Sequence, residues 1–464
     1  MIKVLNQYFP GRLFVLLITE NMLILMGIWA AIAIRVGSLR VSLLSYPGLF
    51  GKAMLITVVI QACLYYADIY DLRSASSRAD VLFRLLQAFG VACIILASIF
   101  YLFPQVRLGS GIVETSLFTI VSAILLWRIL VEWINRAYVA GERILLVGSG
   151  EVVQELAREV RLRNDLPINL LGSVVESGLE NSTTMAGIPA LGALDDLARI
   201  VEESQPNRLV IALKERRQQL PIPLLLKLRL SGLVVEDASS LYEKITGKIP
   251  VGSIHPSSLI FADGFRQSRA LRVYGRVTGF IAALAGLLIA GPVMLLIAIA
   301  IKLDSRGPIF YRQSRIGLNG KQYDILKFRS MKADAESKSG PVWAQEADPR
   351  ITRVGRILRK SRLDELPQFL NVLFGEMSFV GPRPERPYFV ELLKAKIPFY
   401  DLRHAVRPGI TGWAQVSRDY GATVEEAREK LEYDLFYLKN VSLSFDALVL
   451  FQTVKIVLFG RGSR

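Results

Sequence analysis

Two adjacent carboxylates, Asp364 and Glu365, lie next to each other among several arginines and lysines. Pro367 follows them, and proline is common in the first turn of a helix, so both carboxylates are expected near a helix N-terminus. Free N–H groups and the helix dipole attract phosphate there, and Arg359 would help to neutralise it. A carboxylate beside a bound phosphate is a candidate nucleophile or metal ligand. Taken alone, the segment also fits a solvated face with a capping box that begins at Ser361.

Further cationic side chains suit the same chemistry. Residues 323–331 alternate in polarity, which predicts a strand with Lys327 and Arg329 on one face. Arg383 stands between two prolines, which would stiffen its backbone and aim its guanidinium at a phosphate. Residues 407–415 add another segment with proline and glycine turns. Each segment alone could be an ordinary turn, but their presence together around one carboxylate pair favours a phosphate site.

The composition indicates a membrane protein with soluble parts. The chain has 464 residues, of which 52% are hydrophobic, and this is too apolar for an ordinary soluble protein of that length. The length predicts about three domains. The formal charge of +15 suits anionic lipid, phosphate-bearing substrates or nucleic acid. Two cysteines and two histidines argue against a zinc site of Cys/His type and against a disulfide framework.

Four apolar runs open the chain, and each is long enough to span a bilayer, which takes about 20 residues. They are residues 13–34, 50–70, 81–103 and 112–133. Most basic residues in the short connections fall on the side that carries both ends of this segment. The positive-inside rule therefore places both ends in the cytoplasm.

An α/β pattern follows the fourth run. Residues 143–147 predict a buried parallel strand, 151–163 an amphipathic helix, and 170–175, 208–213 and 233–235 further strands. The tight turn between the first strand and the helix contains Gly148 and Gly150. A dinucleotide fingerprint requires a third small residue where Val153 stands, so a structural or regulatory Rossmann-like domain is favoured over a bound dinucleotide.

A fifth apolar run, residues 277–303, has basic residues at both ends, which conflicts with a simple span. Gly291 and Pro292 lie near its middle, and proline removes a helical hydrogen bond. A kinked, re-entrant helix that returns to its entry face accounts for both observations. The alternative is a fifth span with a proline kink. A re-entrant helix would keep Asp364 and Glu365 in the cytoplasm, where nucleotide sugars are found.

These residues together resemble the monotopic phosphoglycosyl transferases, which begin bacterial exopolysaccharide, capsule and O-antigen synthesis. The resemblance covers residues 272–458 and rests on the proline-containing helix and on four ordered motifs, 327–331, 363–368, 381–384 and 407–413. The preceding part resembles the long form of the family, typified by the undecaprenyl-phosphate galactose and glucose phosphotransferases. The expected architecture is a membrane α/β protein with a four-helix transmembrane bundle (1–138), a Rossmann-like cytoplasmic domain (139–265), and a monotopic α/β catalytic domain with a re-entrant membrane helix (266–464).

The resemblance implies transfer of sugar-1-phosphate from a UDP-sugar to undecaprenyl phosphate, with release of UMP. Asp364 matches the nucleophile, which would form a phosphosugar–aspartate intermediate, and Glu365 matches the second member of the dyad. Magnesium, held in part by Asp364, would offset the charge of the pyrophosphate. The matched phosphate-binding or site-lining residues are Arg359, Arg383, Arg418, Lys327, Arg329, Arg407, Trp413 and Gln415.

Partners and location follow from the same resemblance. They are a UDP-sugar, undecaprenyl phosphate, lipid of the bacterial inner membrane and a second copy of the chain, with no nucleic acid and with the catalytic domain in the cytoplasm. Two other functions stay open. A membrane-attached NAD-dependent dehydratase or epimerase would need a Tyr-x-x-x-Lys pair, a spacing that Tyr323 and Lys327 have, and a polysaccharide-assembly scaffold would need no dyad. The sequence does not identify the sugar, the pathway or any ligand of the Rossmann-like domain.

Overall fold

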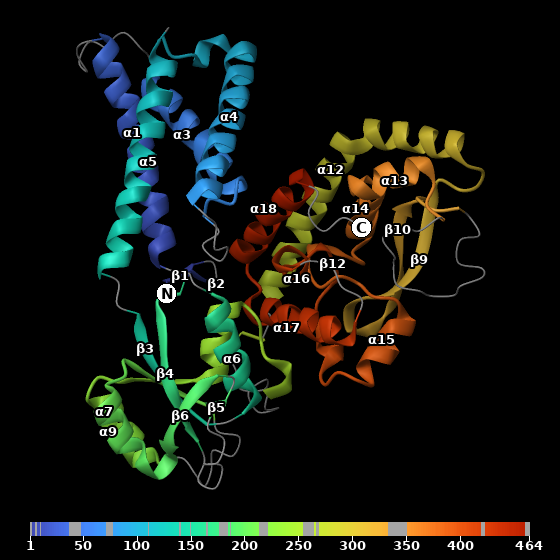
Figure 1. Ribbon diagram of the computed structural model, residues 1–464. Helices are drawn as coiled ribbons and strands as arrows, with labels where there is room; N and C mark the ends of the chain where they lie inside the picture. Colours follow the sequence, from blue (N-terminus) through green and yellow to red (C-terminus); the bar gives the residue numbers. More distant parts are fainter. Residues whose placement is uncertain are drawn as a thin grey trace. The chain divides into compact units, whose positions relative to one another are not determined.

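The computed structural model divides into two compact units, Met1–Ile2 with Phe9–Glu236, and Lys3–Tyr8 with Asp237–Arg464. Figure 1 shows the elements of both. The structure describes residues 2–4, 7–9, 11–36, 48–70, 78–109, 111–138, 141–148, 150–163, 166–175, 184–185, 187–212, 221–253, 264–265, 269–332, 350–418 and 423–459.

Four apolar helices open the first unit, and they agree with the four predicted runs. They are α1 (Gly11–Val36), α3 (Leu49–Tyr66), α4 (Arg78–Leu102) and α5 (Ile112–Tyr138), with a 3-10 turn η1 (Pro104–Val106) before α5. Two short strands, β1 (Ile2–Val4) and β2 (Gln7–Phe9), precede α1 in the chain, and most of their residues group with the second unit. Each helix contains a stretch long and apolar enough to cross a membrane. One apolar core with residues from all four helices holds them together.

A buried ion pair also ties the first of these helices to the last. The Glu20 carboxylate on α1 lies 2.7 Å from the Arg128 guanidinium on α5. Glu20 also accepts a hydrogen bond from the Tyr70 hydroxyl, which in turn accepts one from Gln61 at 2.8 Å. Because a charge inside an apolar bundle is costly unless it is paired, this network fixes which helix faces meet.

The rest of the first unit is an α/β layer with a six-stranded sheet of order β5-β6-β4-β3-β7-β8. β3 pairs in parallel with both β4 and β7, and β4 with β6, whereas β5 is antiparallel to β6. The elements are β3 (Glu142–Val147), α6 (Glu151–Leu162), β4 (Ile168–Val175), β5 (Thr184–Met185), β6 (Ile188–Ala193), η2 (Leu194–Asp196), α7 (Leu197–Ser204), β7 (Arg208–Ile211), α9 (Ile222–Leu230) and β8 (Val234–Asp237). The predicted parallel sheet is confirmed, since continuous apolar runs such as β3 are buried between helices.

The second unit carries the candidate catalytic residues. Its elements are α10 (Ala238–Thr246), η3 (Val251–Ser253), α12 (Arg269–Asp304), β9 (Phe310–Ile316), η4 (Leu318–Gly320), β10 (Gln322–Phe328), α13 (Arg353–Lys360), η5 (Leu363–Glu365), α14 (Gln368–Phe374), β11 (Ser378–Val380), α15 (Pro387–Lys394), η6 (Tyr400–Ala405), β12 (Gly409–Thr411), α16 (Trp413–Ser417), α17 (Val424–Asn440) and α18 (Leu443–Phe459). β9 and β10 form an antiparallel hairpin, and β11 pairs in parallel with β12. α10 falls inside the range 139–265 expected for the Rossmann-like domain but groups with this second unit.

The helix α12 is 36 residues long, with Pro292 inside it. Figure 1 shows that α12 does not run straight, because its first and last parts point in different directions. Proline accounts for such a bend, since it removes one hydrogen bond and its ring displaces the preceding turn. α12 is the fifth helix among the described residues that is long and apolar enough to cross a membrane.

Two apolar clusters hold α12 against the catalytic unit. The first joins α12 to β10 and α14, through Ala283, Ile325, Val372 and Met377. The second joins α12 to β10 and α13, through Ile297, Ile301, Phe328 and Leu358, with Leu363 and Leu366 packed against it. The carboxylates at positions 364 and 365 lie between these two leucines, so α12 braces the chain on both sides of them.

Candidate active site

The carboxylate pair lies on a short 3-10 turn between α13 and α14. Asp364 and Glu365 end η5, and Pro367 directly precedes α14, as predicted. The turn follows Arg362, whose φ of 55° is in the left-handed region, a conformation that costs about 1–3 kcal/mol for a residue other than glycine. Ser361 donates its hydroxyl to carbonyls of α13. It therefore belongs to the end of α13, and the capping-box alternative is wrong.

Glu365 is held by two cations. Its Oε1 lies 2.9 Å from the Lys327 Nζ and 3.0 Å from the Arg383 Nη2. Burial by itself raises the pKa of Glu365, but Lys327 and Arg383 outweigh burial and hold this pKa below its usual range. Glu365 is therefore ionised and fixed in one position, and it orients both cations.

Asp364 differs from its neighbour although it is buried to a similar extent, with 9% of its surface exposed. Within the described residues, its carboxylate accepts no hydrogen bond and forms no ion pair. Burial raises the pKa of Asp364, Glu365 raises it further, and Lys327 and Arg359 oppose this effect. The result is a desolvated carboxylate whose oxygens are free to meet a substrate or a metal.

Asn371, which the sequence analysis missed, sets the distance between the dyad and the hairpin. Its Oδ1 accepts a hydrogen bond from the Leu326 N–H at 3.0 Å, and its Nδ2 donates to the Asp324 carbonyl at 2.8 Å. A side chain on α14 thus bonds to β10 as a neighbouring strand would. Since Lys327 follows Leu326 directly, this bridge places Lys327 beside Glu365. The signal in the sequence was a pair of amides one turn apart, Gln368 and Asn371, within an otherwise apolar helix.

Three glycines position Arg383 by allowing two backbones to touch. A Cβ on Gly381 would lie 2.4 Å from the Arg407 carbonyl oxygen, one on Gly409 2.2 Å from the Gly381 nitrogen, and one on Gly412 2.2 Å from the Gly381 carbonyl. The Gly381 N–H donates to the Thr411 carbonyl at 2.9 Å. The motifs 381–384 and 407–413 are therefore two halves of one backbone junction.

A buried ion pair between Arg403 and Asp434 holds the backbone of Arg383, and the sequence analysis missed this pair as well. The Arg403 guanidinium donates to the Arg383 carbonyl at 3.0 Å and lies 2.8 Å from the Asp434 carboxylate. Burial raises the pKa of Asp434 to about 6, although Arg403 opposes this. Arg403 has no turn or proline context to mark it, which is why its role was not visible in the sequence.

The structure does not bring Arg329 to the dyad. Its guanidinium donates to the carbonyls of Arg306 at 3.0 Å and Ser305 at 2.7 Å, and to the Ser305 hydroxyl at 2.9 Å. These groups follow the end of α12, where carbonyls lack partners within the helix. Arg329 thus fastens the end of α12 to the strand that carries Lys327.

Trp413 and Arg407 also lie in supporting positions. The Trp413 indole donates to the Gly247 carbonyl at 2.9 Å and packs on Phe436 and Phe445 in the core of the unit. Arg407 donates from Nε to the Gly375 carbonyl at 3.0 Å, just after α14.

Gln415 and Arg418 line one small pocket with Arg383. Arg418 forms ion pairs with Glu429 and, at 3.7 Å, with Glu426. Gln415 donates to the Ile410 carbonyl at 3.3 Å. Arg359 lies at the end of α13, where its charge lowers the pKa of Asp364. Of the predicted residues, Lys327, Arg383 and Arg359 thus act directly on the dyad.

Among the described residues, no three carboxylate, histidine or cysteine side chains come together as a metal cluster. The two carboxylates at positions 364 and 365 still fit magnesium, which often binds through one or two carboxylates together with substrate phosphates. Of these two, Asp364 is the carboxylate that has neither a hydrogen bond nor an ion pair with the described residues.

The glycine turn of the α/β layer has Gly148 at a φ of 114° and Gly150 as the cap of α6, while Ser149 lies outside the described residues. Val153 is buried where the dinucleotide fingerprint requires a small residue. Tyr323 and Lys327 lie on β10 in the other compact unit. The pair that a dehydratase would need is therefore not in the domain of the glycine turn.

Comparison with known proteins bears on the family of the chain. A model of the family described as bacterial sugar transferase matches residues 270–460, and one described as CoA-binding domain matches residues 66–229. The chain is 43% identical over 187 residues to the exopolysaccharide production protein PSS of Rhizobium leguminosarum bv. phaseoli, a match that covers 39% of this chain and 94% of the relative. The chain belongs to the bacterial sugar transferase family.

Two longer bacterial sugar transferases match as well. The UDP-N-acetylgalactosamine-undecaprenyl-phosphate N-acetylgalactosaminephosphotransferase of Aeromonas hydrophila is 41% identical over 235 residues, which cover 51% of this chain and 55% of the relative. The UDP-glucose:undecaprenyl-phosphate glucose-1-phosphate transferase of Escherichia coli (strain K12) is 45% identical over 185 residues, which cover 39% of this chain and 40% of the relative. The matched segments thus span about half the length of these relatives. The predicted resemblance is confirmed for the family.

Proposed function

We propose that this bacterial sugar transferase moves a sugar-1-phosphate from a UDP-sugar to undecaprenyl phosphate and releases UMP, as the initiating step of a surface polysaccharide. The observation that carries the proposal is the contrast between two adjacent buried carboxylates. Glu365 is fixed by Lys327 and Arg383. Burial raises the pKa of Asp364, whose carboxylate accepts no hydrogen bond from the described residues. A scaffold would not need that contrast, and a covalent transferase would.

The transfer takes place in two displacements at one phosphorus. In the first, an Asp364 oxygen attacks the β-phosphorus of the UDP-sugar. An aspartyl O–P bond forms, the bond from the β-phosphorus to the bridging oxygen breaks, and UMP leaves with that oxygen and its electron pair. In the second, an oxygen of undecaprenyl phosphate attacks the same phosphorus, the aspartyl O–P bond breaks, and the Asp364 carboxylate is regenerated.

The surrounding cations have separate tasks in these steps. Arg383 and Lys327 orient Glu365 and place positive charge beside the attacked phosphoryl group. Arg359 acts on Asp364 from α13 and favours its ionised, nucleophilic form. When bound, magnesium would neutralise charge on the pyrophosphate, with Asp364 as its protein ligand.

The proposed site also requires a particular placement of α12. A straight helix of 36 residues would be about 54 Å long, against a hydrocarbon core of about 30 Å. We propose that α12 enters the inner membrane from the cytoplasm, bends at Pro292 and returns, as the re-entrant prediction states. The dyad, braced between clusters on both parts of α12, would then lie at the cytoplasmic interface, where a lipid acceptor and a soluble donor can meet. A single cysteine in place of the exposed Arg312, in a Cys63→Ser, Cys93→Ser background, should react with an impermeant maleimide only after the cells are opened. Labelling from the periplasmic side would contradict this topology.

The reaction is tested by UMP release from a panel of UDP-sugars, with undecaprenyl phosphate and magnesium, using membranes that contain the chain. We expect release to require the lipid acceptor and to be lost in Asp364→Asn. The matched control is Asp401→Asn, which changes an aspartate that is 52% exposed in the same unit and should keep full activity. The preferred donor identifies the sugar.

The covalent step has a separate readout. Without acceptor, a donor labelled at the β-phosphate should leave its label on the wild-type chain but not on Asp364→Asn. UMP release without a labelled chain would instead indicate direct transfer. Chelation of magnesium should stop release, and added magnesium should restore it. Homodimer formation stays a prediction.

A further inference from the structure

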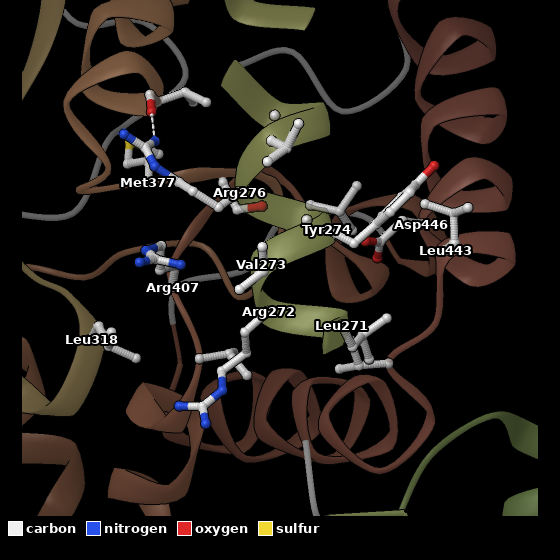
Figure 2. Close-up of a pocket in the computed structure, with 18 of the residues that line it drawn as sticks. Leu271, Arg272, Val273, Tyr274, Arg276, Leu318, Met377, Arg407, Leu443 and Asp446 are labelled. Atoms are coloured by element: carbon white, nitrogen blue, oxygen red, sulfur yellow. Dashed lines mark hydrogen bonds between the residues drawn. The ribbon is translucent and has the colours of Figure 1, made fainter. Parts of the chain in front are cut away.

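A cavity of about 550 Å³ lies beside the first turns of α12. Its walls come from the first turns of α12, from the segment after α14 with β11, from the residues that precede β12, and from α17 and α18. Figure 2 shows several of these residues around the cavity. The volume is in the range of small-molecule sites, which are about 300–1,000 Å³. It does not include Asp364 or Glu365 among its lining residues.

The charge of this cavity is unbalanced. Arg269, Arg272, Arg276 and Arg407 line it, and the one acidic side chain in its lining is Asp446 on α18. Asp446 accepts a hydrogen bond from the Tyr437 hydroxyl at 2.8 Å. Burial lowers the pKa of Arg407 below its usual value, and Arg276 and Arg272 lower it further. Such mutual repulsion between cations is relieved when an anion binds between them.

Two of these cations are already fixed in place by the fold. Arg276 donates to the carbonyls of Val372 and, at 2.7 Å, Leu373, at the end of α14, and a dashed line in Figure 2 marks one such bond. Arg407 donates its Nε to the Gly375 carbonyl, and within the part of the chain that the structure describes its other N–H groups have no partner. Arg272 lies one turn before Arg276 on the same helix face, and among the described residues its guanidinium has neither a hydrogen bond nor an ion pair. Of the four arginines, Arg276 and Arg407 are thus preorganised by the fold, whereas the donors of Arg272 are available to a ligand.

Most of the remaining wall is apolar, with Leu271, Val273, Val277 and Leu443 among its residues. Val273 and Val277 also expose 62% and 51% of their surface. Cationic side chains lie here beside apolar ones, at the start of the helix with the highest hydropathy among the candidate spans that the structure describes. This arrangement matches a molecule that has a phosphate at one end and hydrocarbon at the other.

We propose that this cavity binds the phosphate group of an anionic membrane lipid, with Arg272, Arg276 and Arg407 as its cationic wall. The site is distinct from the dyad and does not depend on the transfer reaction. Bound lipid would hold the start of α12 at the membrane surface.

The test is native mass spectrometry of the full chain, stripped of lipid in a non-ionic detergent and titrated with dioleoyl phosphatidylglycerol or with dioleoyl phosphatidylcholine. We expect phosphatidylglycerol to bind about tenfold more tightly, and Arg272→Gln to remove that preference. The matched control is Arg158→Gln, an exposed arginine on α6 that does not line the cavity, and it should bind as the wild type does. Asp364→Asn should also bind normally, which separates this site from the reaction.

A second variant guards against a loss of binding that is caused by unfolding. Asp446→Asn removes the carboxylate of the cavity but keeps an acceptor for Tyr437, and it should tighten phosphatidylglycerol binding about two- to fivefold. Unfolding cannot produce such a gain. Equal binding of both lipids, or unchanged phosphatidylglycerol binding in Arg272→Gln, would overturn the proposal. Inorganic phosphate is the third probe: if it binds through Arg272 while phosphatidylglycerol does not, the lipid source is refuted.

Discussion

The Lys327 ammonium lies 2.9 Å from the Glu365 carboxylate, and the two residues are 38 positions apart in the chain. Both are largely buried, with 19% and 12% of their side-chain surface exposed. This contact joins the β9–β10 hairpin to the turn that carries Asp364. The ionisation of Glu365 therefore depends on where β10 places Lys327.

Lys327→Met should destabilise the chain by about 1–3 kcal/mol, because the largely buried Glu365 would keep Arg383 as its one ion-pair partner among the described residues. The pKa of Glu365 lies below its usual value, so its contribution to stability is present above about pH 4.3 and is lost as the pH falls through the folded-state pKa. Removal of Lys327 should move that loss to higher pH. Thermal unfolding between pH 3 and pH 8 measures it. Lys394→Met, which breaks an ion pair with 51% and 52% exposed side chains, is the control and should change little. Equal effects of the two variants would contradict the buried clamp.

Asp364→Asn should abolish transfer and yet raise the melting temperature at neutral pH. The folded chain holds the Asp364 proton more tightly than the unfolded chain does, because burial raises its pKa. Stability from this group therefore falls as the pH rises above about 3.9, and an amide avoids that loss. The gain should be about 1–3 °C and should shrink toward acid pH. A lower melting temperature at pH 7 would mean that the carboxylate is stabilised by groups that the burial argument omits.

Arg329→Met should act on stability rather than on substrate binding. The loss of several hydrogen bonds to carbonyls after α12 should cost about 2–4 kcal/mol. The KM for the UDP-sugar should stay near the wild-type value in the fraction that is folded, whereas Arg383→Met should alter kcat and KM. Arg312→Met, on the exposed side of β9, is the stability control. A specific rise in KM for Arg329→Met would place this arginine at the substrate.

Gly286→Ala and Gly291→Ala, in the same helix, should have opposite effects. A Cβ on Gly286 would lie 2.8 Å from the Phe369 ring, and one on Gly291 has no atom within 4 Å. Phe369 packs on Phe379 with ring centroids 5.6 Å apart, so it has little room to move. Gly286→Ala should cost about 1–3 kcal/mol, and Gly291→Ala should be neutral or stabilising by up to about 1 kcal/mol. Thermal unfolding in one detergent compares them, and equal melting temperatures would show that α12 does not press on α14.

Periodicity was sufficient to predict most elements. The apolar runs of the first four helices, the alternation of β10 and the continuous apolar strand β3 each follow from a local pattern. Pro367 marked the start of α14 for a similarly local reason. These features depend on residues that are neighbours in the chain.

The roles of the arginines could not be predicted in the same way. Arg329 and Arg383 have the same side chain and both lie in family motifs, but one binds carbonyls after α12 and the other binds Glu365. Trp413 likewise resembles a site residue by its motif and is a core residue by its packing. Whether a motif residue contacts the dyad or supports the fold depends on contacts between distant segments. No local periodicity encodes those contacts.

The bent helix α12 has a practical consequence for any attempt to obtain the catalytic unit without a membrane. Its side chains Ala283, Ile297 and Ile301 are parts of the clusters that hold α14, β10 and α13. Deleting α12 would therefore expose the apolar faces under the turn that carries Asp364, and the shortened chain would aggregate or lose its active geometry. Solubility would have to come from redesigning the outer face of α12, where Leu288, Ile289 and Leu303 are exposed, while its inner face is left as it is.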